Sequence, residues 1–466
     1  MSDQQEQPNT SQVSVNPRPP FFAGLSTSPG FKFIITGIIT FLLLIPALLV
    51  WALVEERANR ADQVAQSISQ GWGNQQRING PYLVVPYLTK QKQNDVYIDV
   101  RRYAIYSPAK LEATSDLEVE ERKKSIYSTP LYHMKSKLSG TFDAIDTSQI
   151  IARNGRPRLR EAFLAIEVSD LAGFRSEVVA ELNGGEGVIF SPGLAGLHPS
   201  TSPNRYNNYN NSGKSSGIHL NVDEALLDQS IKFEIDLAIN GSRALEIVPS
   251  GKTTEVSMTS NWPHPGFNGR FLPETRNITE TGFDAKWTVP NLARGISAVS
   301  FGTQISNADS IIEVSFVKPL KFYQLVSRTL KYAVAFFSLV FLAIFILELT
   351  GKNPVHWIQY ILTGLAMVVF YILLLALAEQ VGFDIAYVLA SLATTGLIAW
   401  YVGNALASRN AIYVIASVVG LTYAIMYLIL KEDEYALLIG AIIAFAAIAM
   451  TMFATRNVDW SRSASK

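Results

Sequence analysis

The last third of the chain alternates long uncharged apolar runs with short polar segments. A bilayer core about 30 Å thick needs roughly 20 apolar residues in a helix. The first apolar run, 332–347, is short for a transmembrane span, but one more helical turn through Glu348 to Thr350 lengthens it. Five such runs are untypical of a water-soluble core, so we predict five transmembrane helices within 331–455. The uncharged runs are 332–347, 357–378, 385–404, 411–430 and 435–455.

Another apolar run, 33–53, lies near the start of the chain and is followed at once by Glu55, Glu56 and Arg57. A cleaved signal peptide has a shorter apolar stretch and lacks a long polar leader. Because a polar, Pro-rich leader precedes this run, we interpret it as an uncleaved anchor. We predict a disordered segment at 1–30 and a transmembrane helix at 31–54, kinked by Pro46.

The basic residues of the short segments predict the orientation. Lys and Arg accumulate in short cytoplasmic loops. If the N-terminus is cytoplasmic, the short outer loops hold only Lys431, whereas the inner segments are basic. This favours cytoplasmic termini, including a tail at 456–466, and a large domain outside the cytoplasm. The basic residues of the inner segments are Arg18, Lys32, Lys352, Arg409, Arg456, Arg462 and Lys466.

Between the anchor and the later helices, residues 55–325 change to a different periodicity. Residues 55–70 continue helically from the membrane, and β-branched and aromatic stretches separated by turns follow at 82–88, 96–105 and 232–239. This pattern is typical of an antiparallel sandwich. The fold class is therefore α+β. The polar segment 199–217 is predicted to be a loop, lying inside one sandwich or separating two subdomains.

The composition of the chain limits which partners and which kinds of binding site we expect. The formal net charge is zero and the chain contains no cysteine. We therefore expect no nucleic-acid partner, no disulfides and no thiolate metal site. The five histidines show no paired ligand spacing, so no metal or cofactor is expected. Ser250-Gly251-Lys252-Thr253 imitates a phosphate-binding loop, but Glu246 replaces the required glycine, and we predict a β-turn.

The segment from Ser260 to Phe267, which reads SNWPHPGF, is a candidate functional loop. Two prolines flank His264, so the chain must leave the sheet in a stiff bend. Trp262 and Phe267 supply apolar area next to it. One interpretation is a packed corner of the sandwich, and the other is a loop that binds a ligand or a partner.

The predicted membrane helices contain two carboxylates, Glu348 and Glu379, both near helix ends. Charged groups in a membrane are costly and often functional, but end positions allow a side chain to reach the interface. We expect neither to have a buried basic partner, so interfacial anchoring is favoured over a transport role. His356, Gln359 and Tyr360 begin the next span, one short loop away from Glu348, and we expect them to cluster with it.

Several strings together resemble the CreD family of Gram-negative inner membrane proteins. The resemblance covers nearly the whole chain from the first span onward. Two departures are Trp357, where the family tends to have Pro, and an Asn-rich stretch near Tyr206. The carrying strings are NGPYL from Asn79, VPY from Val85, SNWPHPGFNGRFLP from Ser260, GFDAKW from Gly282, Gln359-Tyr360 with Gly364, Phe370-Tyr371, Leu373 to Glu379, Gly382-Phe383, Ala386-Tyr387 and RNVDW from Arg456.

The resemblance implies one anchor, a periplasmic domain and a helical bundle. It also implies expression under a two-component regulatory system and a link with envelope integrity and colicin tolerance. No reaction is established for the family, so no catalytic residues are carried over. We therefore expect a non-enzymatic inner membrane protein that supports envelope integrity or stress response. Its expected partners are the bilayer and a periplasmic or inner-membrane protein. The alternative is a small-solute transporter or channel built from the C-terminal helices.

Overall fold

The computed structural model describes residues 29–93, 95–199, 216–295, 297–305, 310–316, 322–350, 354–431 and 436–456. The chain forms two compact units. One contains Met1–Ala58 and Leu320–Lys466, and the other contains Asn59–Pro319. The predicted N-terminal leader and most of the predicted polar loop at 199–217 lie outside the described residues.

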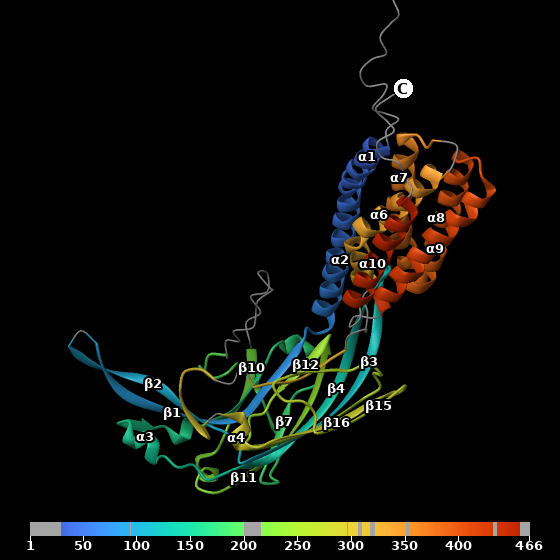
Figure 1. Cartoon of the computed structure of the whole chain (residues 1–466). Helices are drawn as coiled ribbons and strands as arrows, with labels where there is room; N and C mark the ends of the chain where they lie inside the picture. Colours follow the sequence, from blue (N-terminus) through green and yellow to red (C-terminus); the bar gives the residue numbers. More distant parts are fainter. Residues whose placement is uncertain are drawn as a thin grey trace, which may run out of the picture. The chain divides into compact units, whose positions relative to one another are not determined.

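The first unit is a bundle of apolar helices (Figure 1). It joins the N-terminal anchor to the C-terminal helices, although more than 250 residues separate them in the sequence. The helices are α1 (Pro29–Leu42), α2 (Leu44–Trp72), α5 (Phe322–Lys331), α6 (Ala333–Thr350), α7 (Trp357–Val381), α8 (Phe383–Ala405), α9 (Arg409–Lys431) and α10 (Ala436–Thr455).

The anchor is one long apolar helix with a break at Leu43. Proline has no backbone N–H, so Pro46 cannot donate to the carbonyl of Leu42 four residues earlier. A turn lies at Leu43 between α1 and α2 within one continuous helix, Gly30–Trp72, and the kink at Pro46 stays a prediction. As predicted, α2 continues as a helix beyond the apolar run, to Trp72.

The described residues include four helices long and apolar enough to cross a membrane, and three of these are α7, α8 and α9. Helices α5 and α6 are bent by 50° at Tyr332 and make a further span if they are counted together. Within α10, Leu438–Phe453 is a shorter apolar helix. The predicted set of C-terminal apolar helices is confirmed, whereas their number as spans stays a prediction.

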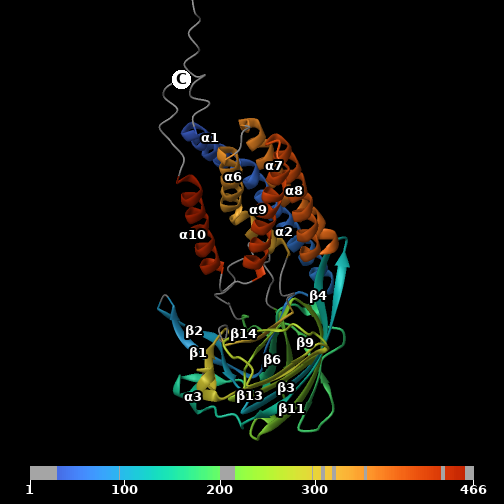
Figure 2. The same ribbon diagram turned by 45° about the vertical axis from the view of Figure 1, so that its right-hand side comes forward.

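The second unit contains two β-sheets (Figure 2). The ten-stranded sheet follows the order β14-β18-β12-β1-β6-β10-β9, with β2 and β5 also on β1 and β17 on β2. Its strands are β1 (Gln76–Gln93), β2 (Val96–Tyr106), β5 (Gly155–Pro157), β6 (Phe163–Val168), β9 (Ser191–Pro192), β10 (Ser216–Asn221), β12 (Ala244–Val248), β14 (Gly266–Gly269), β17 (Val299–Gly302) and β18 (Ile312–Ser315).

The eight-stranded sheet follows the order β15-β16-β13-β3-β4-β11-β7-β8. Pairing is antiparallel except between β1 and β12 and between β3 and β13. The short helices α3 (Ser148–Ala152) and α4 (Asn291–Arg294) lie in connections. The strands are β3 (Lys110–Lys124), β4 (Tyr127–Phe142), β7 (Val179–Leu182), β8 (Val188–Ile189), β11 (Ile231–Ser242), β13 (Thr253–Ser260), β15 (Thr275–Thr279) and β16 (Gly282–Val289).

A single large core joins the two sheets, because apolar side chains alternate along the strands. In β11, Ile231, Phe233 and Ile235 are buried and the intervening residues are exposed. They share one cluster with Leu83 and Leu164 from the other sheet. Side chains on one face of a strand recur every second residue, which produces this pattern. The predicted mainly antiparallel, sandwich-like domain is confirmed, and residues 59–319 form one compact unit.

The string that imitates a phosphate-binding loop connects two strands, as predicted. It follows β12 and leads into β13. The hydroxyl of Thr254 accepts a hydrogen bond from the Gly251 backbone N–H at 3.1 Å. The segment is therefore a turn between strands.

Candidate functional site

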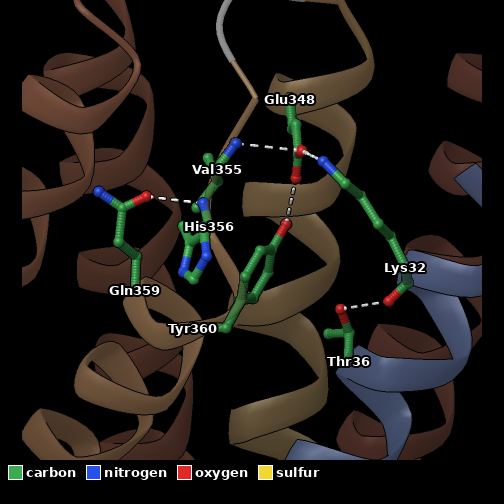
Figure 3. Close-up of polar contacts among 7 residues, drawn as sticks. All are labelled: Lys32, Thr36, Glu348, Val355, His356, Gln359 and Tyr360. Atoms are coloured by element: carbon green, nitrogen blue, oxygen red, sulfur yellow. Dashed lines mark hydrogen bonds and ion pairs between the residues drawn. The ribbon is translucent and has the colours of Figure 1, made fainter. Parts of the chain in front are cut away.

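Glu348, at the C-terminal end of α6, is the centre of a polar cluster in the bundle (Figure 3). Its carboxylate forms an ion pair with Lys32 of α1. The Tyr360 hydroxyl donates to Oε2 at 2.9 Å, and the backbone N–H of Val355 donates to Oε1 at 3.1 Å. The Glu348 side chain is only 7% exposed. Its charge is thus balanced by one cation and two further donors.

The start of α7 positions Tyr360 in this cluster. His356 is the N-cap, and its ring accepts from the backbone N–H of Ile358 at 3.4 Å. Gln359 closes a capping box by accepting from the His356 backbone N–H at 2.8 Å. A capping box satisfies backbone donors that lack a helical partner. Of the three residues expected near Glu348, Tyr360 therefore contacts it, whereas His356 and Gln359 fix the helix start.

Glu379, near the other end of α7, forms a second and looser cluster. The Tyr323 hydroxyl of α5 donates to Oε1 at 3.2 Å. Arg57 of α2 lies with Nη1 at 3.8 Å from Oε2. The Glu379 side chain is 11% exposed, but that of Arg57 is 41% exposed. This is a long ion pair at a partly open position.

Both carboxylates have basic partners, but neither partner is buried, since the side chains of Lys32 and Arg57 are 26% and 41% exposed. The partners, Lys32 and Arg57, come from the two ends of the anchor. The sequence shows these basic residues on opposite sides of the first apolar run, but not which carboxylates they pair with. The 25 residues of α7 span about 37 Å, slightly more than a hydrocarbon core of about 30 Å. The two pairs therefore hold the anchor to the bundle near both boundaries of a bilayer.

Close packing supports the contact between the anchor and α7. A Cβ atom added to Gly364 of α7 would lie 2.0 Å from Cδ1 of Leu43. Glycine thus lets the anchor approach α7 more closely than any other residue would. The rings of Phe33 and Phe345 are also in contact, with centroids 5.6 Å apart. The anchor is therefore an integral member of the bundle.

Aromatic side chains fill the bundle between α6, α7, α8 and α9. The ring of Tyr423 lies 4.5 Å from Phe370 and 4.7 Å from Phe336, measured between centroids. The Tyr387 hydroxyl donates a hydrogen bond to the Tyr423 backbone carbonyl at 2.8 Å. The Thr394 hydroxyl donates a hydrogen bond to the Tyr423 hydroxyl at 3.0 Å. All five side chains are buried. This arrangement is a packed interior.

The SNWPHPGF segment leads from β13 into β14 in the sheet unit. Trp262 is buried, and its indole N–H donates to the backbone carbonyl of His264 at 3.0 Å. Phe267 packs edge-on against Phe283 and Trp287, with centroids 5.5 and 5.8 Å away. The His264 side chain is exposed. The contacts of Trp262 and Phe267 favour the packed-corner interpretation of the segment.

A pair of carboxylates in the ten-stranded sheet was missed by sequence reasoning. Glu246 lies directly opposite both Arg77 and Glu313 on the neighbouring strands. It forms an ion pair with Arg77 and accepts from Gln75 Nε2 at 2.7 Å. Burial raises the pKa of Glu313 and Glu246 raises it further, whereas Asn268 and Arg77 lower it. Only strand register brings these residues together.

The structure contains no candidate metal centre within its described residues, where no group of three or more His, Asp or Glu side chains could hold an ion. The carboxylates described above are held by Lys, Arg, Tyr and amide groups instead. Such an arrangement neutralises charge and fixes helices or strands.

Comparison with known proteins gives two matches to one family. The family model described as "Inner membrane protein CreD" matches residues 28–461. Inner membrane protein CreD of Escherichia coli strain K12 is 32% identical over 432 residues, which cover 90% of this chain and 91% of that protein. Both matches extend over the helical and the sheet units. The chain belongs to the CreD family of inner membrane proteins.

Proposed function

We propose that this inner membrane protein supports the integrity of the cell envelope or its response to stress, without catalysing a reaction. The observation that carries the proposal is the anchor, which is fastened to the C-terminal helices by ion pairs at both ends. Such a bundle holds the chain in the membrane. The sheet unit, Asn59–Pro319, is then the part that contacts a periplasmic or membrane partner.

The proposal includes an orientation with both termini in the cytoplasm and the sheet unit in the periplasm. The bias of Lys and Arg in the short segments supports it. The absence of native cysteine allows a direct test. A cysteine at Leu292, which is 93% exposed on the sheet unit, is expected to react with a membrane-impermeant maleimide in intact spheroplasts. Labelling only after lysis would contradict this orientation.

Solute translocation by the C-terminal helices is the second candidate function. The bend of 50° between α5 and α6 favours it, because broken helices often line substrate sites in transporters. The buried aromatic side chains around Tyr423 oppose it, because they fill the space between four helices. We therefore place this function behind the envelope role.

The test is uptake of a dye and of a detergent by cells that lack the gene, with and without a plasmid copy. Uptake is expected to rise in the deletion strain and to return to normal with the plasmid. Unchanged uptake, under conditions where immunoblots show the protein in wild-type cells, would overturn the envelope role. The translocation function would then be tested by solute flux in proteoliposomes.

Plasmid variants assign the effect to one unit. His264→Ala changes an exposed ring of the sheet unit, whereas Glu379→Gln changes a carboxylate of the bundle. Under the envelope role, Glu379→Gln is expected to restore normal uptake. A variant that is present at the wild-type level but fails to restore uptake identifies its unit as the working part.

A further inference from the structure

Strands β1 and β2 continue beyond the body of the sheet unit as a projecting ribbon (Figure 1). Among the described strands, β5 pairs with β1 only up to Thr89, and β17 pairs with β2 only from Tyr103 onward. Between these points the two strands pair only with each other and turn at Asp95, where φ is 63°. An isolated two-stranded ribbon is only marginally stable in water. A projecting ribbon of this kind therefore calls for a stabilising contact.

The two faces of the ribbon differ in chemistry. Val96, Ile98 and Val100 share one face, and Gln91 lies opposite Ile98 on it. Farther along β2, the same face carries Ala104, which is buried in the core between the sheets. On the ribbon this face is open, since Val96 is 61% and Ile98 40% exposed. The apolar stripe thus extends the core face of the sheet into solvent.

The opposite face carries charges that already have partners. Asp99 pairs with Arg156 at 3.6 Å, and Arg101 pairs with Glu161 at 2.9 Å. These pairs are exposed and contribute little to stability. This face has one exposed apolar side chain, Tyr97, at 66%, whereas the stripe has three apolar side chains in succession.

The two edges of the ribbon also differ. The β1 edge carries Lys90 and Lys92, and lysines on an edge strand discourage pairing with another strand. The β2 edge carries the valines and isoleucine of the stripe, and its charges Asp99 and Arg101 already have partners. Its outward backbone groups have no strand partner among the described residues from Val96 to Arg102. The β2 edge is thus the one suited to receive another strand.

We propose that this edge pairs antiparallel with β2 of a second copy of the chain, with Ile98 opposite Ile98. In that register Val96 of each copy lies opposite Val100 of the other, so one face becomes a continuous apolar stripe. A centre at Asp99 places two aspartates opposite each other, which is unfavourable. A centre at Val100 places Arg102 opposite Ile98. The self-complementary register is the one centred on Ile98.

The proposed contact between two β2 strands is small, but confinement of both copies to one membrane favours it. A stable interface buries about 1,600 Å², more than a few paired residues provide. Two copies in one membrane are confined together, so their effective concentration is high. Pairing is therefore expected in the membrane, and dissociation is expected after dilution into detergent.

The test uses the full chain, whose native sequence contains no cysteine. Directly opposite residues of antiparallel strands have Cα atoms about 4.5–5.5 Å apart, within the range that a disulfide bridges. Ile98→Cys is expected to give a reducible dimer when membranes are oxidised. Val96→Cys alone is expected to give little dimer, but to cross-link with co-expressed Val100→Cys. Leu292→Cys, at a 93% exposed position elsewhere on the unit, measures random collision.

A second variant separates pairing from folding. Ile98→Lys places two like charges in opposition and is expected to lower the yield of the Val96→Cys and Val100→Cys product at least tenfold. Because Ile98 is 40% exposed, the thermal unfolding midpoint is expected to stay unchanged. A dimer yield for Ile98→Cys no higher than for Leu292→Cys would overturn the proposal. A photo-cross-linker at Ile98 that captures lipid or a different protein instead would also overturn it.

Discussion

The two units place carboxylates in shielded positions in different ways. In the helical unit, Glu348 and Glu379 each have their own cation and their own tyrosine donor. In the ten-stranded sheet, Glu246 and Glu313 lie side by side and share a single nearby arginine, Arg77. Charge is thus matched one to one in the bundle but not in the sheet.

The comparison shows that the burial of both partners decides how much each ion pair contributes to the stability of the fold. A buried pair is expensive to break, because the remaining charge has lost its water. An exposed pair contributes little, because water and salt screen it. Glu348 represents the first case and Glu379 approaches the second, since Arg57 is 41% exposed. Glu313 is different again, because its burial and, to a lesser extent, the neighbouring charge of Glu246 oppose its ionisation.

The largest effect is expected for Glu348→Ala, which removes the partner of Lys32. The free energy of unfolding of the helical unit should fall by about 3 kcal/mol, the low end for a broken buried pair, because the Lys32 side chain is 26% exposed. Titration with a denaturing detergent in mixed micelles measures it. The double variant Lys32→Met with Glu348→Ala removes both charges and should recover part of the loss, because the Tyr360 hydroxyl and the Val355 N–H still lack their acceptor. Equal losses in the single and double variants would contradict the charge explanation.

Tyr360→Phe tests the neutral donor of the same cluster. It removes the 2.9 Å hydrogen bond to the Glu348 carboxylate, and bonds to charged groups contribute about 1.5–3 kcal/mol. The same titration should show a loss near the lower value. Tyr371→Phe is the matched control, because that buried hydroxyl has no hydrogen-bond partner among the described residues. This control is expected to be neutral or stabilising, and a comparable loss from it would count against the hydrogen bond.

Glu313→Gln tests the unmatched charge in the sheet unit. The folded-state pKa of Glu313 is raised, so the folded protein binds its proton more tightly, and this contribution to stability is lost as pH rises through that pKa. Gln should therefore stabilise the sheet unit by about 1 kcal/mol or less near neutral pH. The gain should vanish below the ordinary carboxyl range, where the wild-type Glu313 is protonated. Denaturant unfolding at both pH values, followed by tryptophan fluorescence, measures the difference.

The exposed Glu118 of β3 gives a control for this experiment. Glu118→Gln is expected to change stability little at either pH, because water screens an exposed charge. A gain from Glu313→Gln that stays constant from low to neutral pH would contradict the ionisation of Glu313 as its cause.

Glu379→Gln is expected to have the smallest effect, about 0.5 kcal/mol or less. The ion pair with Arg57 is long, at 3.8 Å, and a glutamine oxygen can still accept the hydrogen bond from Tyr323. The detergent titration used for Glu348→Ala applies here too. A loss as large as that of Glu348→Ala would show that the two ends of the anchor are fastened equally.

Much of the fold was predictable, because its signals are local. Apolar runs predict helices wherever they are long, and alternation predicts β11 and the other long strands. Helix α5 was missed, because Phe322–Lys331 mixes apolar and basic residues and resembles neither a span nor a strand.

The candidate site was predictable only in part. Tyr360 lies one helical turn beyond the loop that follows α6, so its contact with Glu348 could be expected from short separation. Its cation could not, since Lys32 is 316 positions away. Likewise, Arg77 and Glu246 are neighbours only through the parallel pairing of β1 with β12.

The sequence by itself determined the membrane helices, the two-sheet domain and the family, because each depends on patterns of neighbouring residues. Only the tertiary structure showed that the ion pairs Lys32–Glu348 and Arg57–Glu379 connect the anchor to the other helices of the bundle. It also decided that Val96 and Ile98 are left on an open ribbon. Packing and strand register join residues that are distant along the chain, and hydrophobic periodicity carries no record of such pairs.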